Sequence, residues 1–537
     1  MDETPPTAIV RLKLAESFVR RESLKFPSKY CRLLEAGFSA SGVFLSDGRL
    51  VTTATIAAPF VGLARKLADD GYRKSWKRLV QVEVAWKRRT WSKARVVALA
   101  RNQILAQKLT KFFGGGENLK TNSTTNDATA IRFINDLERE SKIMIFDFLL
   151  VTVDLATRRN LINVLPTNQL HVGQDVYLYG TPFGSTLPDV FLNSVTKGII
   201  SIILDDVILL TDARYVVGVE GGALFVKKQS KIILVGIVIS PLTSSLLGLT
   251  IVASIQSIVE SFQPSLFDWC HHLFPWSSTI ITPPSLEKHV LPSIVAVETG
   301  ARRGSAVIID ENSKLALTCS HVLSNKQDSL TVTLSNKKCT ANVLWASALP
   351  DIALLKLNTS EKLCALHGLS STLPSPSDGS NVFVIGYPQL CGGGDNFLSP
   401  VSTHGVVAKR ICCHDDDSKT TEVFPVMLQL TAPIWGGSSG GAVVCAQSGR
   451  LVGIATSTIR DETTADGGGT IMPNVSLAIP IEWIRMALKE VGNREQNHHR
   501  QQHTTEEKRT KRAAAKLWQL STDVNAAVAS HTLFSKL

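Results

Sequence analysis

The sequence is poor in cysteine and lacks the marks of a secreted, disulfide-rich protein. Its nine cysteines among 537 residues are too sparse for a disulfide framework, and the odd count leaves at least one thiol unpaired. The first residues, Met1-Asp2-Glu3-Thr4, contain no basic segment followed by an apolar one, so no secretory signal is expected. We therefore expect reduced thiols inside the cell.

The spacing of a structural metal site is also missing. Cys412 and Cys413 are adjacent, whereas zinc sites use cysteines separated by two residues and a second pair of ligands. The histidine cluster His498, His499 and His503 lies in a polar segment, where such side chains are most often solvated. The sequence thus predicts no metal and no cofactor.

One uncharged stretch, residues 232–256, is long enough to imitate a membrane helix, which needs about 20 apolar residues. However, its first part is rich in β-branched residues, and Pro241 and the serines Ser244 and Ser245 interrupt its centre. This turn chemistry favours two buried strands over one helix, so we expect no membrane span.

The segment Gly437-Ser438-Ser439-Gly440-Gly441, followed by an apolar strand, has the composition of a nucleophile loop. A reactive serine must project from a tight turn, and backbone N–H groups must point at a developing oxyanion; glycine permits both. His321 ends one apolar run and Asp351 begins another. Each alone fits a core imidazole or a strand cap, but the order His, Asp, Ser is that of chymotrypsin-like enzymes.

With these motifs, residues 293–491 resemble a trypsin-fold protease of the Deg/HtrA type. The matching segments are Ser293–Val297, Gly304–Ile309, Gly386-Tyr387-Pro388 and Leu451–Ile454. The resemblance implies that Ser439 is the nucleophile, His321 the general base and Asp351 its orienting carboxylate. It also implies an oxyanion hole formed by the N–H groups of Gly437 and Ser439.

The N-terminal half repeats this pattern without its reactive residues. The repeated segments are Ser41–Leu45, Gly180-Thr181-Pro182, Glu220–Ala223 and Leu234–Ile237. The counterparts of the histidine, aspartate and serine are Ile56, Asp147 and Glu220. Since base and nucleophile are both missing, we expect a degenerate protease domain that supports or regulates the other copy.

The expected fold is therefore all-β, with tandem chymotrypsin/trypsin-like double β-barrel domains, each closed by a C-terminal helix. We predict a degenerate domain at 1–265 with a basic insertion at 57–146, and a linker at 266–284. A catalytic domain at 285–492 and a flexible polar tail at 493–537 follow.

The predicted insertion is strongly basic. Residues 65–95 hold 11 Lys/Arg against 3 Asp/Glu, interleaved with Trp76, Trp86 and Trp91. Such a pattern can bind nucleic acid, but without a recognised module a solvated face or a protein-docking surface is favoured.

The last three residues, Ser535-Lys536-Leu537, match the peroxisomal address that an import receptor reads. Together with the degenerate copy, they make the sequence similar to the family of peroxisomal leader-peptide-processing proteases, called glyoxysomal processing proteases in plants. The resemblance implies a serine endopeptidase of the peroxisomal matrix that forms an acyl-enzyme. Its expected substrates are imported matrix proteins, whose N-terminal leaders it removes, and some β-oxidation enzymes. Self-cleavage and a homo-oligomer stay open.

Two other functions stay open. The loop around Ser439 also fits the nucleophile elbow of an α/β-hydrolase-type esterase, but that fold needs a histidine after the serine. The later histidines, His498, His499, His503 and His531, all lie in the predicted tail. The second alternative is a non-catalytic peroxisomal adaptor built on protease folds.

Overall fold

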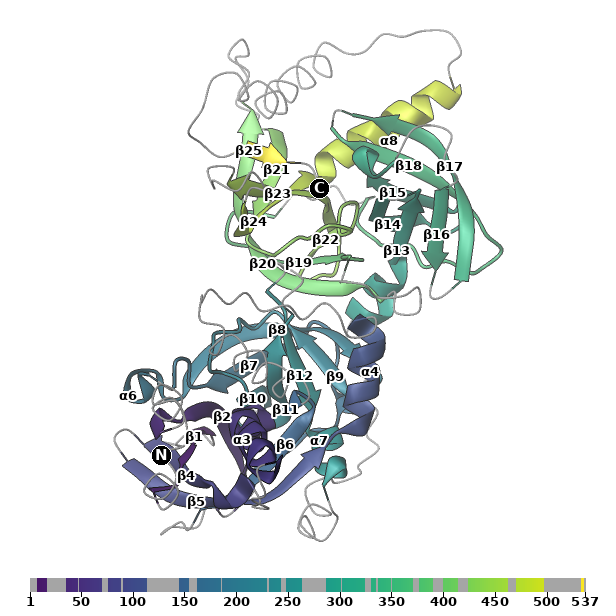
Figure 1. The fold of residues 1–537 in the computed structure, drawn as a ribbon. Coiled ribbons are helices and arrows are strands. Elements are labelled where there is room, and N and C mark those ends of the chain that lie inside the picture. The colour runs from purple at the N-terminus through teal and green to yellow at the C-terminus, as the bar shows by residue number, and fades with distance from the viewer. Residues whose placement is uncertain are drawn as a thin grey trace. The chain divides into compact units, whose positions relative to one another are not determined.

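The chain is built almost entirely from antiparallel strands, as Figure 1 shows. The computed structural model describes residues 7–16, 35–46, 48–69, 76–87, 90–113, 144–153, 162–184, 186–228, 231–242, 248–262, 286–300, 302–323, 330–334, 337–348, 350–369, 376–389, 399–413, 424–461, 470–496 and 533–535. The chain divides into two units. Unit 1 is Met1–Thr243 with Gly248–Ile281, and unit 2 is Ser244–Leu247 with Thr282–Leu537.

Unit 1 contains two closed six-stranded barrels. The first has the strand order β1-β2-β3-β6-β5-β4 and the second the order β10-β11-β12-β9-β8-β7. The strands are β1 (Thr7–Leu14), β2 (Phe38–Ser46), β3 (Arg49–Thr53), β4 (Val80–Lys87), β5 (Thr90–Arg101), β6 (Asp147–Val153), β7 (Asp175–Gly180), β8 (Ser194–Leu204), β9 (Ile208–Thr211), β10 (Ala223–Lys228), β11 (Lys231–Pro241) and β12 (Thr250–Ser254). Its helices are α3 (Ala58–Asp69), α4 (Gln103–Phe113), α6 (Pro188–Phe191) and α7 (Ile255–Ser261), with short 3-10 turns η2 (Ala54–Ala57), η3 (Trp76–Arg78) and η4 (Thr167–Gln169).

Unit 2 repeats this plan. Its first barrel has the order β13-β14-β15-β18-β17-β16, which matches the first barrel of unit 1 strand for strand. Its other strands form a sheet of order β22-β19-β20-β21-β24-β23-β25, and a β22–β23 pairing closes six of them into a ring. The strands are β13 (Ile294–Thr299), β14 (Arg302–Asp310), β15 (Leu315–Cys319), β16 (Leu330–Leu334), β17 (Lys337–Ser347), β18 (Ile352–Asn358), β19 (Asn381–Gly386), β20 (Val401–Cys413), β21 (Phe424–Leu430), β22 (Ala442–Cys445), β23 (Leu451–Asp461), β24 (Thr470–Pro480) and β25 (Leu533–Ser535). The helical elements are the π-turn η7 (Leu286–Val290), the 3-10 turns η8 (Leu291–Ser293) and η9 (Ser320–Val322), and α8 (Ile481–Gln496).

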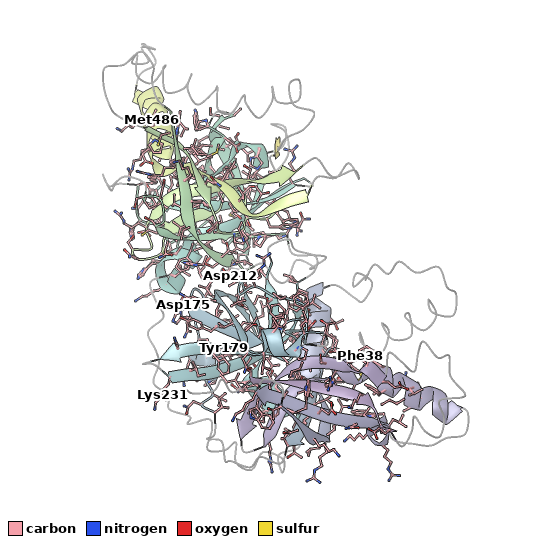
Figure 2. All side chains as sticks on the ribbon, turned by 90° about the vertical axis from the view of Figure 1, so that its left-hand side faces the viewer. Phe38, Asp175, Tyr179, Asp212, Lys231 and Met486 are labelled. Atoms are coloured by element: carbon pink, nitrogen blue, oxygen red, sulfur yellow. The ribbon has the colours of Figure 1, made fainter. Side chains whose placement is uncertain are left out.

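A helix follows the last barrel strand of each unit. In α7, the Ser254 side chain accepts the N–H of Ser257 (3.2 Å) and caps the helix, while Ile255 and Ile258 are buried. In α8, Trp483 and Ile484 are buried. Figure 2 shows the side chains along both units, with Met486 labelled on α8. The predicted fold class, tandem double barrels each closed by a helix, is confirmed.

The uncharged stretch at 232–256 lies mainly in β11 and β12, so it forms strands with buried central residues, as predicted. Pro241 ends β11, and Ser244 and Ser245 of the predicted turn lie outside the described residues. These two strands pair with each other, for example at Ile237 and Ala253. Among the described residues, no helix is long and apolar enough to cross a membrane.

The predicted insertion at 57–146 is only partly an insertion, because β4 and β5 within it belong to the first barrel. In the sequence, charged residues mask the alternation of buried and exposed positions in these two strands. One of them, Glu83 of β4, forms ion pairs with Arg11 and Lys13 of β1 at 2.6 and 2.7 Å. Arg11 also stacks on the Trp91 ring, 3.9 Å from its centroid. Glu83 and Trp91 of the predicted insertion thus contact basic side chains of β1.

The chain after residue 492 differs from the predicted tail at two points. Helix α8 continues to Gln496. Residues Leu533–Ser535 form β25, which pairs with β23 through Ser535 and Thr458. The histidine cluster at 498–503, Lys536 and Leu537 lie outside the described residues.

Leu355 on β18 tests the packing of the first barrel of unit 2, where it is fully buried. Leu355→Ala is expected to cost about 2–5 kcal/mol of stability, because it leaves a cavity that the barrel cannot close. The matched control is Leu344→Ala on β17, whose side chain is exposed and which should change stability by less than about 0.5 kcal/mol. Hydrogen exchange of the β15 and β17 amides measures both; equal effects would contradict this packing.

Candidate active site

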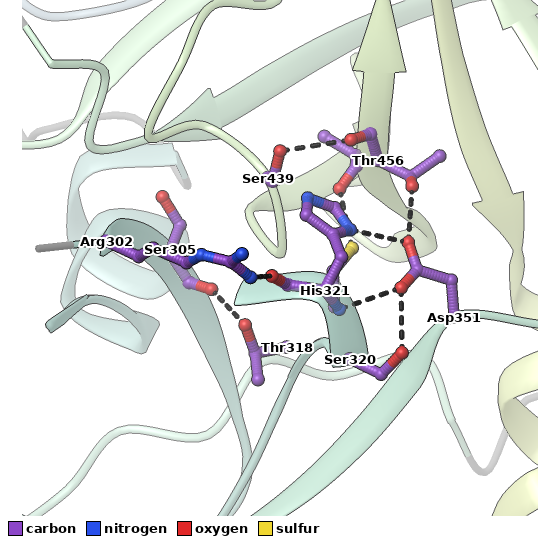
Figure 3. A network of polar contacts seen from close by, with 10 residues as sticks. Arg302, Ser305, Thr318, Ser320, His321, Asp351, Ser439 and Thr456 are labelled. Carbon is purple, nitrogen blue, oxygen red and sulfur yellow. Dashed lines mark hydrogen bonds and ion pairs between the residues drawn. The ribbon is translucent and has the colours of Figure 1, made fainter. Parts of the chain in front are cut away.

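His321 is held in one orientation by Asp351. Strand β15 ends at Cys319, and the turn η9 then carries His321 towards the start of β18, where Asp351 lies. The His321 main-chain N–H donates to Asp351 Oδ1 (3.0 Å), and His321 Nδ1 lies 2.7 Å from Oδ2 (Figure 3). Because a carboxylate accepts, Nδ1 carries the hydrogen and Nε2 is left as the basic nitrogen.

The Asp351 carboxylate is fully buried and therefore needs several donors. Besides His321, the Ser320 hydroxyl donates to Oδ1 (2.9 Å) and the Thr456 hydroxyl donates to Oδ2 (2.8 Å). Asp351 itself adopts a positive φ of 67°, a conformation that aspartate tolerates better than most residues. The network fixes the carboxylate that orients the imidazole.

Ser439 projects from a loop that is pinned to the first barrel by Ser305 of β14. The Ser305 hydroxyl donates to Gly437 O (2.7 Å), and its N–H donates to Ser439 O (2.8 Å). Gly440 has a φ of 85°, and a Cβ there would lie 2.1 Å from Ser305 O. The loop therefore requires glycine directly after the serine.

The structure brings the predicted residues His321, Asp351 and Ser439 together around Thr456. The Ser439 hydroxyl donates to the Thr456 carbonyl (3.0 Å), while the Thr456 hydroxyl binds Asp351. In the described part of the chain, His321 Nε2 is buried and has no hydrogen-bond partner. Ser439 and His321 are thus linked to the same pair of residues, Asp351 and Thr456.

The predicted oxyanion donors are available. Gly437 has a φ of 94°, and within the described residues neither its N–H nor that of Ser439 donates a hydrogen bond. Two unpaired donors beside a serine hydroxyl are the arrangement that stabilises a tetrahedral intermediate. Their catalytic role stays a prediction.

Two residues of this site were missed in the sequence. Ser320 precedes His321, and Thr456 lies on β23, two residues after the matching segment Leu451–Ile454. Neither belongs to a motif with its own signature. Only the pairing of β15 with β18 and the approach of β23 reveal their contacts with Asp351.

Cys319, His321 and Asp351 are also the one group among the described residues whose side chains could converge on a metal ion, with ligand atoms within 4.8 Å of one another. The 2.7 Å distance from His321 Nδ1 to Asp351 Oδ2 is hydrogen-bond geometry. The Cys319 thiol donates to the Ala455 carbonyl (3.2 Å). Each of the three side chains therefore already has a hydrogen-bond partner.

Unit 1 has a loop of the same shape as the Ser439 loop, held by the corresponding hydrogen bonds. The Ser41 hydroxyl donates to Gly218 O (2.9 Å), and the Ser41 N–H donates to Glu220 O (2.8 Å). These bonds match those of Ser305 with Gly437 and Ser439, so Glu220 stands at the position of Ser439. Gly221 has a φ of 77°, close to that of Gly440.

The counterpart of His321 in unit 1 is Thr55, and the prediction of Ile56 is wrong by one residue. The Thr52 hydroxyl donates to Ser41 O (2.5 Å), as the Thr318 hydroxyl does to Ser305 O (2.7 Å). Thr55 lies three residues after Thr52, and His321 lies three residues after Thr318, so these two positions correspond. Ile56 then corresponds to Val322, and both of these side chains are buried in their barrels.

The strand pairing places Asp147 where unit 2 has Asp351, since each lies two residues before the partner of the corresponding threonine: Thr52 pairs with Leu149, and Thr318 pairs with Ala353. Asp147 forms an ion pair with Arg101 at 3.3 Å. Burial raises the pKa of its carboxyl, an effect that the Arg101 guanidinium only partly offsets. Asp147 therefore pairs with Arg101, and Thr55 at the position of His321 has no imidazole for Asp147 to orient.

Comparison with known proteins agrees with this geometry. The trypsin-like peptidase domain family matches residues 304–454. The chain is 29% identical to the peroxisomal leader peptide-processing protease of Mus musculus over 62% of this chain and 58% of that protein. The Homo sapiens protein of the same name is 29% identical over 61% of this chain and 57% of its own length. A probable periplasmic serine endoprotease, DegP-like, of Buchnera aphidicola is 30% identical over 36% and 38%.

The chain thus spans less than two thirds of the length of the two peroxisomal relatives. The family match covers His321, Asp351 and Ser439, which are the three residues that the structure brings together.

Thr456→Val removes one donor to the buried Asp351 carboxylate. A hydrogen bond to a charged group contributes about 1.5–3 kcal/mol, so the rate at which a fluorophosphonate labels Ser439 should fall about tenfold to a hundredfold. Thr458→Val is the matched control, because the Thr458 hydroxyl is buried on the same strand without a partner among the described residues. Equal labelling rates for both variants would contradict the positioning role of Thr456.

Proposed function

Since residues 304–454 are a trypsin-like peptidase domain, we propose that this chain is a serine endopeptidase in which His321, Asp351 and Ser439 form the catalytic triad. The observation that supports it most is the 2.7 Å contact of His321 with buried Asp351, beside a serine loop with two N–H groups that have no acceptor among the described residues. In this arrangement a serine can be activated and an oxyanion stabilised at the same place.

The reaction begins when Ser439 exchanges its hydrogen bond with Thr456 O for one with His321 Nε2. His321 then takes the hydroxyl proton while Oγ attacks the scissile carbonyl. The Gly437 and Ser439 N–H groups hold the resulting oxyanion. When the C–N bond breaks, His321 returns the proton to the leaving amine and an acyl-enzyme forms.

Water completes the cycle. It attacks the acyl carbon as His321 removes its proton, and the proton then passes to Ser439 Oγ as the ester bond breaks. Throughout, Asp351 stays ionised and stabilises the imidazolium, because its own oxygens accept from Ser320, Thr456 and His321.

The substrates we propose are proteins of the peroxisomal matrix that arrive with an N-terminal leader, including some β-oxidation enzymes. Both mammalian relatives are named for processing leader peptides in peroxisomes. We propose a peroxisomal location for this chain; it is supported by the names of the same relatives and by the Ser535-Lys536-Leu537 tripeptide, which would bind the import receptor.

The esterase alternative was wrong in its fold. An α/β-hydrolase needs a doubly wound sheet with its histidine after the serine, whereas Ser439 lies in a double barrel and contacts the network of an earlier histidine. The adaptor alternative differs from the protease only in turnover, which the next experiment measures.

Ser439→Ala should abolish cleavage of a peroxisomal precursor, with a loss in kcat on the order of 10⁶, as removal of a triad nucleophile causes in other serine proteases. The control is Ser377→Ala, which alters an exposed serine outside the site. Gel analysis and N-terminal sequencing of the product report cleavage, and circular dichroism reports folding. Cleavage by a folded Ser439→Ala variant at the wild-type rate would refute the triad.

Removal of Ser535-Lys536-Leu537 should leave the enzyme active but dispersed in the cytosol, because the receptor reads that tripeptide. Fluorescence microscopy of tagged wild-type and truncated chains measures this, with the tripeptide appended to an unrelated fluorescent protein as a positive control. A truncated chain that still reaches peroxisomes would show that another segment carries the address.

A further inference from the structure

The disabled loop of unit 1 is blocked by its own glutamate. Gly218, the counterpart of the oxyanion donor Gly437, donates its N–H to Glu220 Oε2 (2.8 Å). The Tyr215 hydroxyl donates to the other oxygen, Oε1. The N–H group of unit 1 that corresponds to the Gly437 donor of unit 2 thus already binds a carboxylate. The carbonyl of a peptide lying here would therefore not be polarised.

Large apolar side chains are exposed around this loop. The apolar patch consists of Phe183, Leu187, Val190, Val195 and Val217, which are 45%, 50%, 59%, 51% and 64% exposed. These are half of the large hydrophobic side chains that are exposed in the described ranges. Single exposed hydrophobics are ordinary, but here four lie between residues 183 and 195, and the fifth, Val217, is hydrogen-bonded to Phe183; such a group is typical of a binding surface.

The patch is continuous with the loop. Phe183 N–H donates to Val217 O (2.9 Å), which is the counterpart of the Gln389 N–H bond to Gly436 O (2.6 Å) in unit 2. The Leu187 N–H donates to Phe183 O (2.8 Å), and Val190 N–H to Leu187 O (3.2 Å). Val195 pairs with Tyr179 of β7, a residue labelled in Figure 2.

Phe183 is held in a conformation that an aromatic residue rarely adopts. Its φ is 52°, and its ring meets that of Phe191 edge-on at 5.6 Å while 45% of the residue stays exposed. A bulky residue at positive φ is strained, and it persists only where contacts with the rest of the fold offset the cost in free energy. Such residues are concentrated at binding sites. Here the strain presents an aromatic ring beside the loop.

We propose that unit 1 binds an extended apolar segment of a polypeptide at this patch and does not cleave it. The occupant follows from the duplication: the same loop in unit 2 is proposed to receive an extended peptide, so this inference rests on the proposed function. The five patch residues carry no charge, which selects apolar segments. Thr55 supplies no base and Glu220 no nucleophile, so the bound segment stays intact.

Binding of one segment raises the local concentration of the rest of that polypeptide near Ser439. A long substrate gains from unit 1, whereas a short peptide that occupies only the catalytic site does not. The patch should therefore lower KM for unfolded proteins and leave kcat/KM for short peptides unchanged.

The test uses the full chain with Ser439→Ala and a fluorescein-labelled, reduced and carboxymethylated α-lactalbumin as an extended polypeptide. Val190→Glu with Val217→Glu should weaken its binding, measured by anisotropy, about tenfold or more, because two charges would have to be desolvated. Val343→Glu with Leu344→Glu is the control: these β17 residues of unit 2 are 47% and 49% exposed. Equal affinities for both pairs would overturn the proposal.

A second measurement guards against misfolded variants. A benzoylphenylalanine at position 190 of the otherwise unchanged Ser439→Ala chain should photo-crosslink to the labelled polypeptide, and one at position 343 should not. Crosslinks only to a second copy of the chain would identify the patch as a self-association surface and overturn the proposal.

The two proposals fail separately. In a chain that keeps Ser439, Val190→Glu with Val217→Glu should leave short-peptide hydrolysis unchanged and raise KM for the unfolded protein. If the parent chain hydrolyses nothing yet binds the labelled polypeptide at the patch, the protease is refuted and the binding site stands.

Discussion

The buried Ser305 side chain is the interaction on which the rest of the active site depends. Its hydroxyl donates to Gly437 O (2.7 Å) and accepts the Tyr387 N–H (2.8 Å), while its own N–H donates to Ser439 O. One residue of the first barrel thereby fixes the nucleophile loop that the second barrel carries. Because β14 pairs with β15, the same strand also positions the end of β15, after which His321 follows.

Unit 1 shows that this scaffold is separable from its chemistry. Ser41 makes the same three bonds, with Gly218 O, the Thr181 N–H and Glu220 O, so the loop keeps its shape without a nucleophile. What differs is local: a threonine replaces the base, and a carboxylate lies on the N–H group that would hold an oxyanion. A surface that retains the geometry of a substrate site and loses its reactivity is suited to holding polypeptide.

The sequence predicted those parts of this architecture that depend on local rules. Glycines around Ser439, the order of His321 and Asp351, and a repeat of the same pattern were enough for the fold and the candidate triad. Thr456 and Ser320 were not predictable, since their contacts with Asp351 arise only when distant strands pair. The slip from Thr55 to Ile56 has the same origin, because only the bonds from Thr52 to Ser41 and from Thr318 to Ser305 show which residues of the two strands correspond. Charge concealed β4 and β5 in the sequence, although in the structure Glu83 of β4 pairs with Arg11 and Lys13 of β1, and Trp91 of β5 stacks on Arg11.

The central claim is that one unit reacts and the other only keeps the form of a reactive site. Mass spectrometry of the full chain after treatment with a fluorophosphonate tests it most directly, because the reagent modifies only a serine activated by a base and an oxyanion hole. A single adduct on Ser439 is expected, with none in unit 1. No adduct on Ser439, or one on a residue of unit 1, would contradict it.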